Sequence, residues 1–251
     1  MLWRTELRKH LPIFATVWMA TLAAGVAAAI APHVVVLEVV HALCGMLCWT
    51  ASSLYAASVL FRFIALGDDL FLQISSVSRW KLALLKVALL GALMVVQHLI
   101  AVGTDLGQLR NAAGTSFNAA VLYMLLAKTL SIAAFLALVL LAATSAKTLP
   151  GRGASGTFFG LAVVATITAQ AILLWRIGAP ATQDFFIGVG GEMFTVNLYA
   201  NLLPLTLTAP DSGFIPPITG TSVALNAAGI LVFIGCWAVL IRARRFNFLQ
   251  L

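Results

Sequence analysis

The chain has 251 residues, of which 62% are hydrophobic and only 9% are charged. Soluble domains carry about a quarter charged residues, so a soluble fold could not hide this much apolar surface, whereas lipid covers it. The net charge of +7 comes from basic residues at the ends of apolar segments and not from a continuous patch. This distribution excludes nucleic-acid binding and indicates membrane topology.

Residues 1–12 predict a short amphipathic helix in the membrane interface, because apolar residues recur there at helical spacing with charged residues on the other side. The alternative is that this segment is only the flank of the first span. Its basic residues precede an apolar run that ends in three alanines at 27–29, a pattern that resembles a cleavable signal peptide. We expect the run to be retained as the first membrane helix.

Six apolar segments are each long enough to cross a membrane, which takes about 20 residues of helix. Backbone amides cannot go unpaired in lipid, so these segments must be helices. The short alternating strands that build a transmembrane barrel do not occur in the sequence. We therefore predict an all-α fold with one transmembrane domain over 1–251. The predicted spans are 13–31, 35–61, 82–103, 118–144, 157–177 and 221–241.

The basic residues also predict the orientation in the membrane. Of the 15 Lys and Arg residues, Lys128 lies within a span. With the N-terminus in the cytoplasm, Arg110 and Arg176 lie outside, and the remaining twelve (15 − 1 − 2) flank the cytoplasmic ends of the spans. Both termini are therefore predicted to be cytoplasmic, in a multi-pass protein of the inner (cytoplasmic) cell membrane.

The connection between the last two spans, 178–220, is long but still apolar. A structureless loop of this length is uncommon, so we expect short re-entrant helices that dip back into the membrane from outside. The glycine-rich segment 151–156 is predicted to be a flexible turn, because it lacks the Gly-Lys-Ser/Thr ending of a phosphate-binding loop. Three cysteines at 44, 48 and 236 lie in apolar stretches and do not form a disulfide framework.

The cytoplasmic connection after the second span predicts a short amphipathic helix over 67–81 that docks on a cytoplasmic partner. Gly67 breaks the preceding span. Asp68 and Asp69 suit the first turn of a new helix, where the helix dipole favours negative charge. The alternative is an ordinary loop with a basic flank. In the predicted helix, apolar residues repeat at spacings of four and three, which places them on one face. They are Leu70, Ile74 and Val77.

Polar residues inside the spans are costly in lipid and usually face a cavity or a partner. We predict a polar substrate path that is lined by Glu38, His41, His98 and Lys128. Lys128 pairs with Glu38 in one hypothesis, and snorkels or faces a subunit interface in the other. A carboxylate metal site would need a second Glu-x-x-His copy, and a haem site would need two opposed histidines from different spans.

This layout resembles the ABC-2 type permeases, the six-helix membrane subunits of ABC exporters. In that family an elbow helix precedes the first span and a coupling helix follows the second. The family also has a long connection before its last span, which the segment 178–220 matches. The family often has Glu and Pro in its coupling region, where this chain has Asp and no Pro. The residues that match the coupling pattern are Asp68, Asp69, Leu70, Ser78, Arg79, Lys81 and Lys86.

The resemblance implies a permease without a catalytic site, similar to those of lantibiotic and bacteriocin self-protection systems. It implies a dimer with a second permease copy or a relative, and separate cytoplasmic ATPase subunits that bind ATP and Mg. The substrate would be hydrophobic or amphipathic: an antimicrobial peptide, a drug or a lipid. Two alternatives stay open, namely a metal- or haem-binding membrane enzyme and a structural subunit of another membrane complex.

Overall fold

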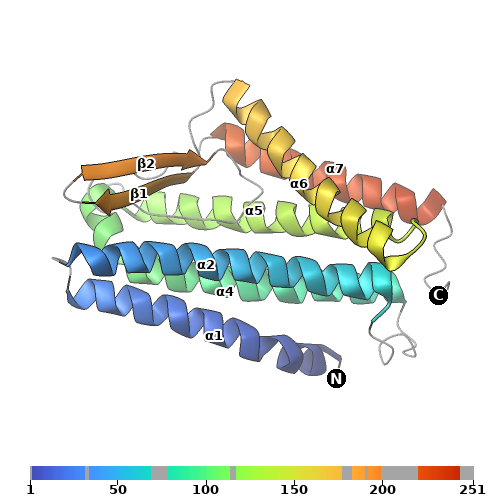
Figure 1. The fold of residues 1–251 in the computed structure, drawn as a ribbon, viewed down its shortest axis with the longest axis horizontal. Helices are drawn as coiled ribbons and strands as arrows, with labels where there is room; N and C mark the ends of the chain where they lie inside the picture. The colour runs from blue at the N-terminus through green and yellow to red at the C-terminus, as the bar shows by residue number, and fades with distance from the viewer. Residues whose placement is uncertain are drawn as a thin grey trace.

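The computed structural model shows a bundle of long helices with a small β-hairpin beside one end (Figure 1). The helices are α1 (Leu2–Ile30), α2 (Val35–Phe61), α4 (Arg79–Ala113), α5 (Phe117–Ala146), α6 (Arg152–Arg176) and α7 (Gly220–Ala243). The structure describes residues 2–31, 34–68, 78–113, 117–176, 183–189, 192–198 and 220–243.

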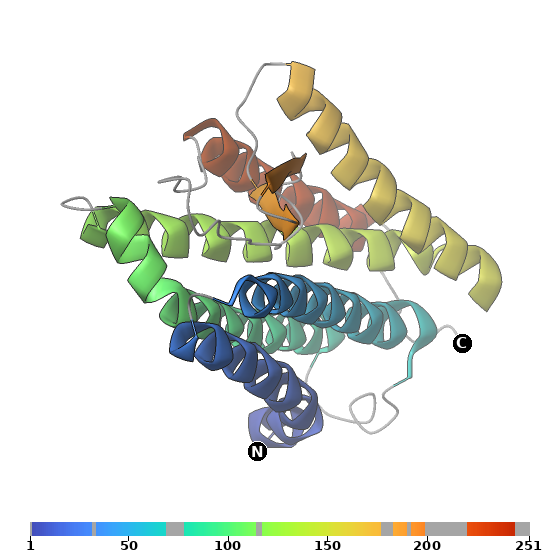
Figure 2. The ribbon, with the colours of Figure 1, turned by 60° about the vertical axis from the view of Figure 1, so that its left-hand side comes forward.

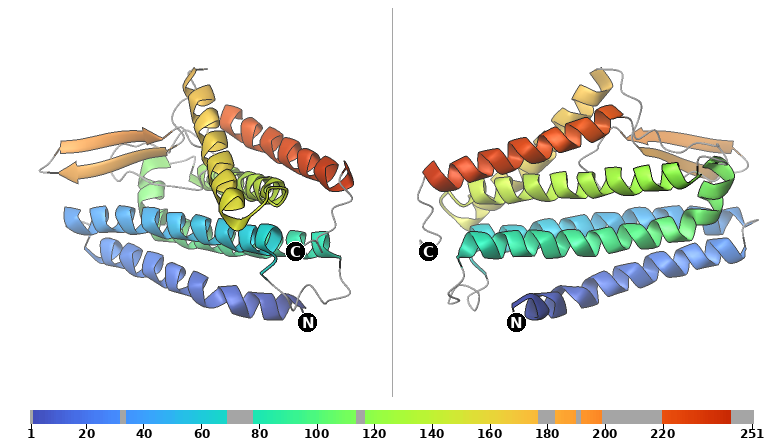
Figure 3. Two further views of the ribbon diagram at one scale, coloured as in Figure 1. Left: turned by 45° about the vertical axis from the view of Figure 1, so that its right-hand side comes forward. Right: turned by 180° about the vertical axis from the view of Figure 1, so that it is seen from behind.

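Six helices of the described chain are long and apolar enough to cross a membrane. They overlie the six predicted spans, so the prediction of six apolar helices of spanning length is confirmed. The helices α1, α2, α4 and α5 run side by side, whereas α6 crosses them obliquely (Figures 1 and 2). The start of α1 and the end of α7 lie at the same end of the bundle, as an even number of spans requires (Figure 3). The side of the membrane that this end faces stays a prediction from the basic residues.

Helix α5 forms the centre of the bundle. Every side chain from Ala134 to Leu140 is buried, and a helix that is apolar and buried on all sides belongs in a core. It contacts α2, α4, α6 and α7, and it lies between the α2–α4 pair and the α6–α7 pair (Figure 3). The core is therefore organised around this one span.

The first twelve residues do not form a separate helix. Helix α1 is continuous from Leu2 to Ile30 and contains Pro12, so the expected interfacial helix over 1–12 is corrected to the first turns of the first span. The physical reason is packing, because Glu6 and His10 are 1% and 5% exposed. Glu6 and His10 turn into the bundle, whereas Arg4, Arg8 and Lys9 stay exposed.

Helix α2 continues into a π-helical turn, η1 (Arg62–Leu66), which ends at Gly67. Gly67 has a φ of 71°, a left-handed conformation that glycine adopts without the steric penalty of a Cβ. The predicted break at Gly67 is thus confirmed. The predicted helix over 67–81 lies mostly outside the described residues, which resume at Ser78 just before α4.

The connection before α7 contains two antiparallel strands, β1 (Gln183–Val189) and β2 (Glu192–Leu198). The short helices expected within 178–220 are therefore wrong for these fourteen residues (7 + 7). Aromatic and β-branched residues favour strands, and two consecutive glycines between the strands are a common hairpin turn signal. The remainder of the connection lies outside the described residues, and its re-entrant course stays a prediction.

Helices α1 and α4 lie in close contact at Gly25. A Cβ on Gly25 would lie 2.4 Å from Cβ and Cγ2 of Thr104, a contact that real structures do not tolerate. Thr104 branches at its own Cβ and cannot swing away without moving its backbone. We expect Gly25→Ala to force the two helices apart and to lower stability by about 1–3 kcal/mol, measured as thermal unfolding of the protein in detergent.

The matched control is Gly103→Ala, because a Cβ at Gly103 meets nothing within 4 Å. This variant should unfold within about 0.5 kcal/mol of the native protein. Equal stability of the two variants would show that α1 and α4 are not in close contact at Gly25.

Candidate functional site

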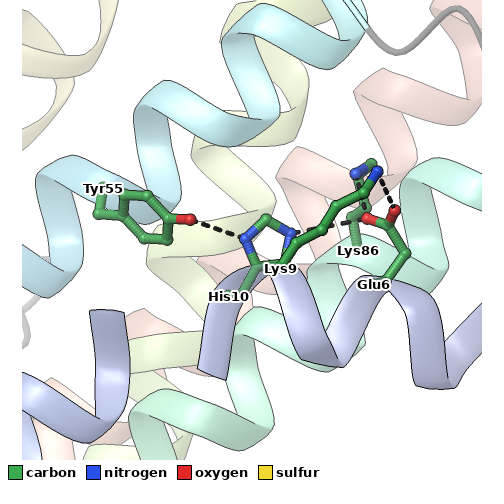
Figure 4. Close-up of polar contacts among 5 residues, drawn as sticks. All are labelled: Glu6, Lys9, His10, Tyr55 and Lys86. Carbon is green, nitrogen blue, oxygen red and sulfur yellow. Dashed lines mark hydrogen bonds and ion pairs between the residues drawn. The ribbon is translucent and has the colours of Figure 1, made fainter. Parts of the chain in front are cut away.

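Five polar side chains from three helices meet near the end of the bundle where α1 begins (Figure 4). We call Glu6, Lys9, His10, Tyr55 and Lys86 the basal network. At its centre, the Glu6 carboxylate accepts hydrogen bonds from Lys86 Nζ and from Lys9 Nζ, the latter at 2.9 Å. The side chains of Glu6 and Lys86 are 1% and 2% exposed. The network therefore holds a buried ion pair between α1 and α4.

The same network extends to α2 through His10. The His10 Nδ1 atom lies 2.8 Å from the Tyr55 hydroxyl, while Nε2 lies 3.6 Å from Glu6 Oε2, which is longer than a hydrogen bond. Lys86 Nζ also lies 4.9 Å from the centre of the Phe63 ring in η1. Helix α1 is thus joined to α2 through His10 and Tyr55, and to α4 through Glu6 and Lys86.

Helical spacing explains why α1 supplies three members. Glu6, Lys9 and His10 stand at positions i, i+3 and i+4, which share one face of a helix. Lys86 follows Arg79 by seven residues, so it lies two turns into α4. Sequence reasoning missed this network, because it assigned Glu6 to a solvated face and Lys86 to a basic flank. The Glu-x-x-Lys-His spacing was the available signal.

A second set of polar residues lies midway along the bundle. We call Trp49, Ser52, Gln97, His98 and Lys128 the mid-bundle cluster. Lys128 Nζ lies 5.0 Å from the centre of the Trp49 ring, and the rings of Trp49 and His98 are 6.1 Å apart. Ser52 Oγ donates a 2.6 Å hydrogen bond to Gln97 Oε1. The cluster joins α2, α4 and α5.

The structure brings together two of the four residues predicted for a substrate path. His98 and Lys128 both approach Trp49. In contrast, Glu38 and His41 precede Trp49 on α2 by eleven and eight residues, which corresponds to about 16 Å and 12 Å along the helix. These backbone positions do not favour the predicted pairing of Lys128 with Glu38.

The two ends of the predicted coupling segment are described. Arg62 Nε donates a 2.8 Å hydrogen bond to Asp68 Oδ2. The Ser78 carbonyl accepts hydrogen bonds from the backbone amides of Lys81 and Leu82 at 3.0 and 3.2 Å, which begins α4 at Arg79. The other predicted coupling residues lie outside the described residues; they are Asp69, Leu70, Ile74 and Val77.

The possible metal ligands of the described chain are dispersed. Within the described residues, no group of three or more His, Cys, Asp or Glu side chains is placed to hold a metal ion. The three cysteines are free, and the sulfur atoms of Cys44 and Cys48 are 3.9 Å apart on one face of α2. Of the four histidines that a haem site could use, His33 lies outside the described residues.

Comparison with known proteins adds no relative. No family model, no curated protein and no solved structure matches the chain.

The folded protein should be strongly destabilised when either Glu6 or Lys86 is changed alone. Glu6→Gln leaves the Lys86 ammonium buried without its carboxylate, a change that typically costs about 3–5 kcal/mol. The double variant Glu6→Gln/Lys86→Met removes both charges and should regain part of that loss. Thermal unfolding in detergent measures the stability of Glu6→Gln, of Lys86→Met and of the double variant.

The exposed Arg62–Asp68 pair provides the control. The side chains of Arg62 and Asp68 are 66% and 32% exposed, so Asp68→Asn should cost at most about 1 kcal/mol. If the double variant at Glu6 and Lys86 lost as much stability as the sum of its two single variants, the two residues would not be coupled.

Proposed function

We propose that this protein is the membrane permease of an ABC exporter of the ABC-2 type. It would move a hydrophobic or amphipathic substrate out of the cell, with ATP and Mg bound by separate cytoplasmic ATPase subunits. In this proposal the end of the bundle that holds the basal network faces the cytoplasm, and a second permease copy or a relative completes the complex.

The observation that carries the proposal is the position of the basal network. It joins α1, α2 and α4 beside both ends of the connection that leads from η1 to α4. A force applied to this connection by a partner would therefore reach three membrane helices together. Such a mechanical link is what an ATP-driven permease needs, because it has to convert motion of a cytoplasmic ATPase into movement of its spans.

Both ends of the connection are held close to the bundle. On the α2 side, Gly67 turns the chain back and the Asp68 amide donates to the Arg62 carbonyl at 3.2 Å. On the α4 side, Ser78 starts the helix without an intervening loop. The two described ends of the connection are thus continuous with η1 and α4, which suits the proposed role of 67–81 as the coupling element.

The packing of the remaining helices fits alternating access. Helix α5 is mostly buried from residue 127 to its end, whereas α6 exposes large apolar residues such as Leu161 and Val164, at 65% and 61%. A fixed central helix and a loosely packed outer helix allow one part of the bundle to move against another. In the proposed dimer, α6 and α7 supply the surface that meets the second permease.

Co-purification tests the proposal directly. The tagged protein, extracted in mild detergent from its native host, should bring down a soluble ATPase with a phosphate-binding loop, at about one ATPase per permease by quantitative mass spectrometry. Recovery of the intact protein with a bound haem or metal and with no ATPase would contradict the proposal.

Substitutions in the connection should separate ATP hydrolysis from transport. We expect Asp69→Asn and Arg79→Ala to leave the complex folded and hydrolysing ATP, while transport in proteoliposomes falls at least several-fold. The control is Arg152→Gln, which removes a basic residue at the same end of the bundle but at the start of α6. Normal transport by both connection variants would argue against coupling through this segment.

A further inference from the structure

Lys128 is the most unusual residue in the interior of the bundle. It is 5% exposed and lies well inside the described length of α5. Its only hydrogen-bonding or electrostatic interaction among the described residues is the contact with the Trp49 ring. An ammonium group inside a membrane bundle is costly unless a counter-charge accompanies it, and such residues commonly mark binding sites.

The chain itself has few carboxylates to offer. Glu6 is engaged by Lys9 and Lys86, and Asp68 is engaged by Arg62. The eight carboxylates of the chain are Glu6, Glu38, Asp68, Asp69, Asp105, Asp184, Glu192 and Asp211.

The two acidic residues on the helices around Lys128 lie at other levels of the bundle. Glu38 is about 16 Å along α2 from Trp49, and Asp105 is about 10 Å along α4 from His98. No described carboxylate forms an ion pair with Lys128. Among the described side chains, Lys128 thus lacks a counter-charge, and a bound anion would supply one.

The mid-bundle cluster contains a second N–H donor, Gln97, and no carboxylate among its five residues. Gln97 is fully buried, and its Nε2 has no hydrogen-bond partner among the described residues, although its Oε1 accepts from Ser52. A buried donor without a partner is costly. Lys128 and Gln97 are thus two N–H donors in one cluster that an acceptor group with negative charge would satisfy.

An apolar groove begins one turn along α4 from Gln97. Gln97, Ile100 and Thr104 stand at i, i+3 and i+7 and so share one face of α4. The groove, of about 320 Å³, runs between α1 and α4; it is lined by Leu22, Gly25, Val26, Ala29, Ile100, Gly103 and Thr104. Such a groove accommodates an alkyl chain beside the polar cluster.

We infer that the mid-bundle cluster binds the anionic head group of an amphiphile, with its alkyl chain in the groove between α1 and α4. The carboxylate or phosphate accepts hydrogen bonds from Lys128 and Gln97, and Trp49 holds the Lys128 side chain in position. This inference rests on the proposed function in one respect: the bound molecule is taken to be the one that the permease exports. Under that function, the substrate is an amphiphile with one acidic head group.

Three ligands with the same chain and different head groups test the inference on the full-length permease, reconstituted without ATP in zwitterionic nanodiscs. Radiolabelled palmitate and hexadecyl phosphate should bind about tenfold or more tightly than hexadecanol, because a hydrogen bond to a charged group contributes at least that factor. Lys128→Met should abolish the difference, and Lys128→Arg should keep most of it.

The matched control is Lys81→Met, because Lys81 also lies over a tryptophan, 5.5 Å from the Trp80 ring centre, but is exposed. This variant should keep the preference for the charged ligands. Ile100→Trp should fill the groove and weaken all three ligands alike. Displacement of palmitate by millimolar acetate alone would assign the site to small free anions and overturn the role of the groove.

Equal binding of palmitate and hexadecanol to the native protein would overturn the inference, since Lys128 would then act as a neutral, packed amine. A preference that persists in Lys128→Met would place the head group elsewhere and overturn it as well. Neither result depends on an ATPase, so failure here is distinguishable from failure of the exporter proposal.

Discussion

A shortage of negative charge constrains how this protein can hold cations inside a membrane bundle. The chain has 15 basic residues and only 8 acidic ones. Lys86 and Lys128 are both buried, but only Lys86 is paired with a carboxylate among the described residues. Glu6 of α1 supplies the counter-charge of Lys86 on α4, whereas in the proposed site a bound anion supplies the counter-charge of Lys128.

The same constraint separates two kinds of position along the bundle. At the basal end, opposite charges meet within the chain, and their mutual pairing stabilises a fixed arrangement of α1, α2 and α4. Midway along, donors outnumber charged acceptors, and the aromatic ring of Trp49 only partly replaces a counter-ion, because cation–π contacts are weaker than buried ion pairs. The basal network holds the three helices in place, whereas the mid-bundle cluster is suited to binding an anionic ligand.

Hydropathy in the sequence was enough to predict six membrane helices, because lipid imposes the same length and apolar character on every span. It could not predict the hairpin, since an apolar run such as Phe185–Val189 serves a strand or a helix equally well by polarity alone. Only some members of the two polar clusters could be predicted from the sequence. His98 and Lys128 stood out by type, whereas the partnership of Glu6 with Lys86 joins residues eighty positions apart, a separation that no local pattern reports.

Helix α4 connects the two clusters mechanically. It is one uninterrupted helix from Arg79 to Ala113, and Lys86 and Gln97 lie eleven residues, about 16 Å, apart on it. A helix transmits displacement along its axis as a nearly rigid rod, because each turn is held by backbone hydrogen bonds to the next. Movement of the segment before Arg79 would therefore shift Gln97 relative to Lys128 on α5, and with it the donors that hold an anionic head group. In the proposed exporter, this geometry couples the cytoplasmic connection to the release of the bound molecule.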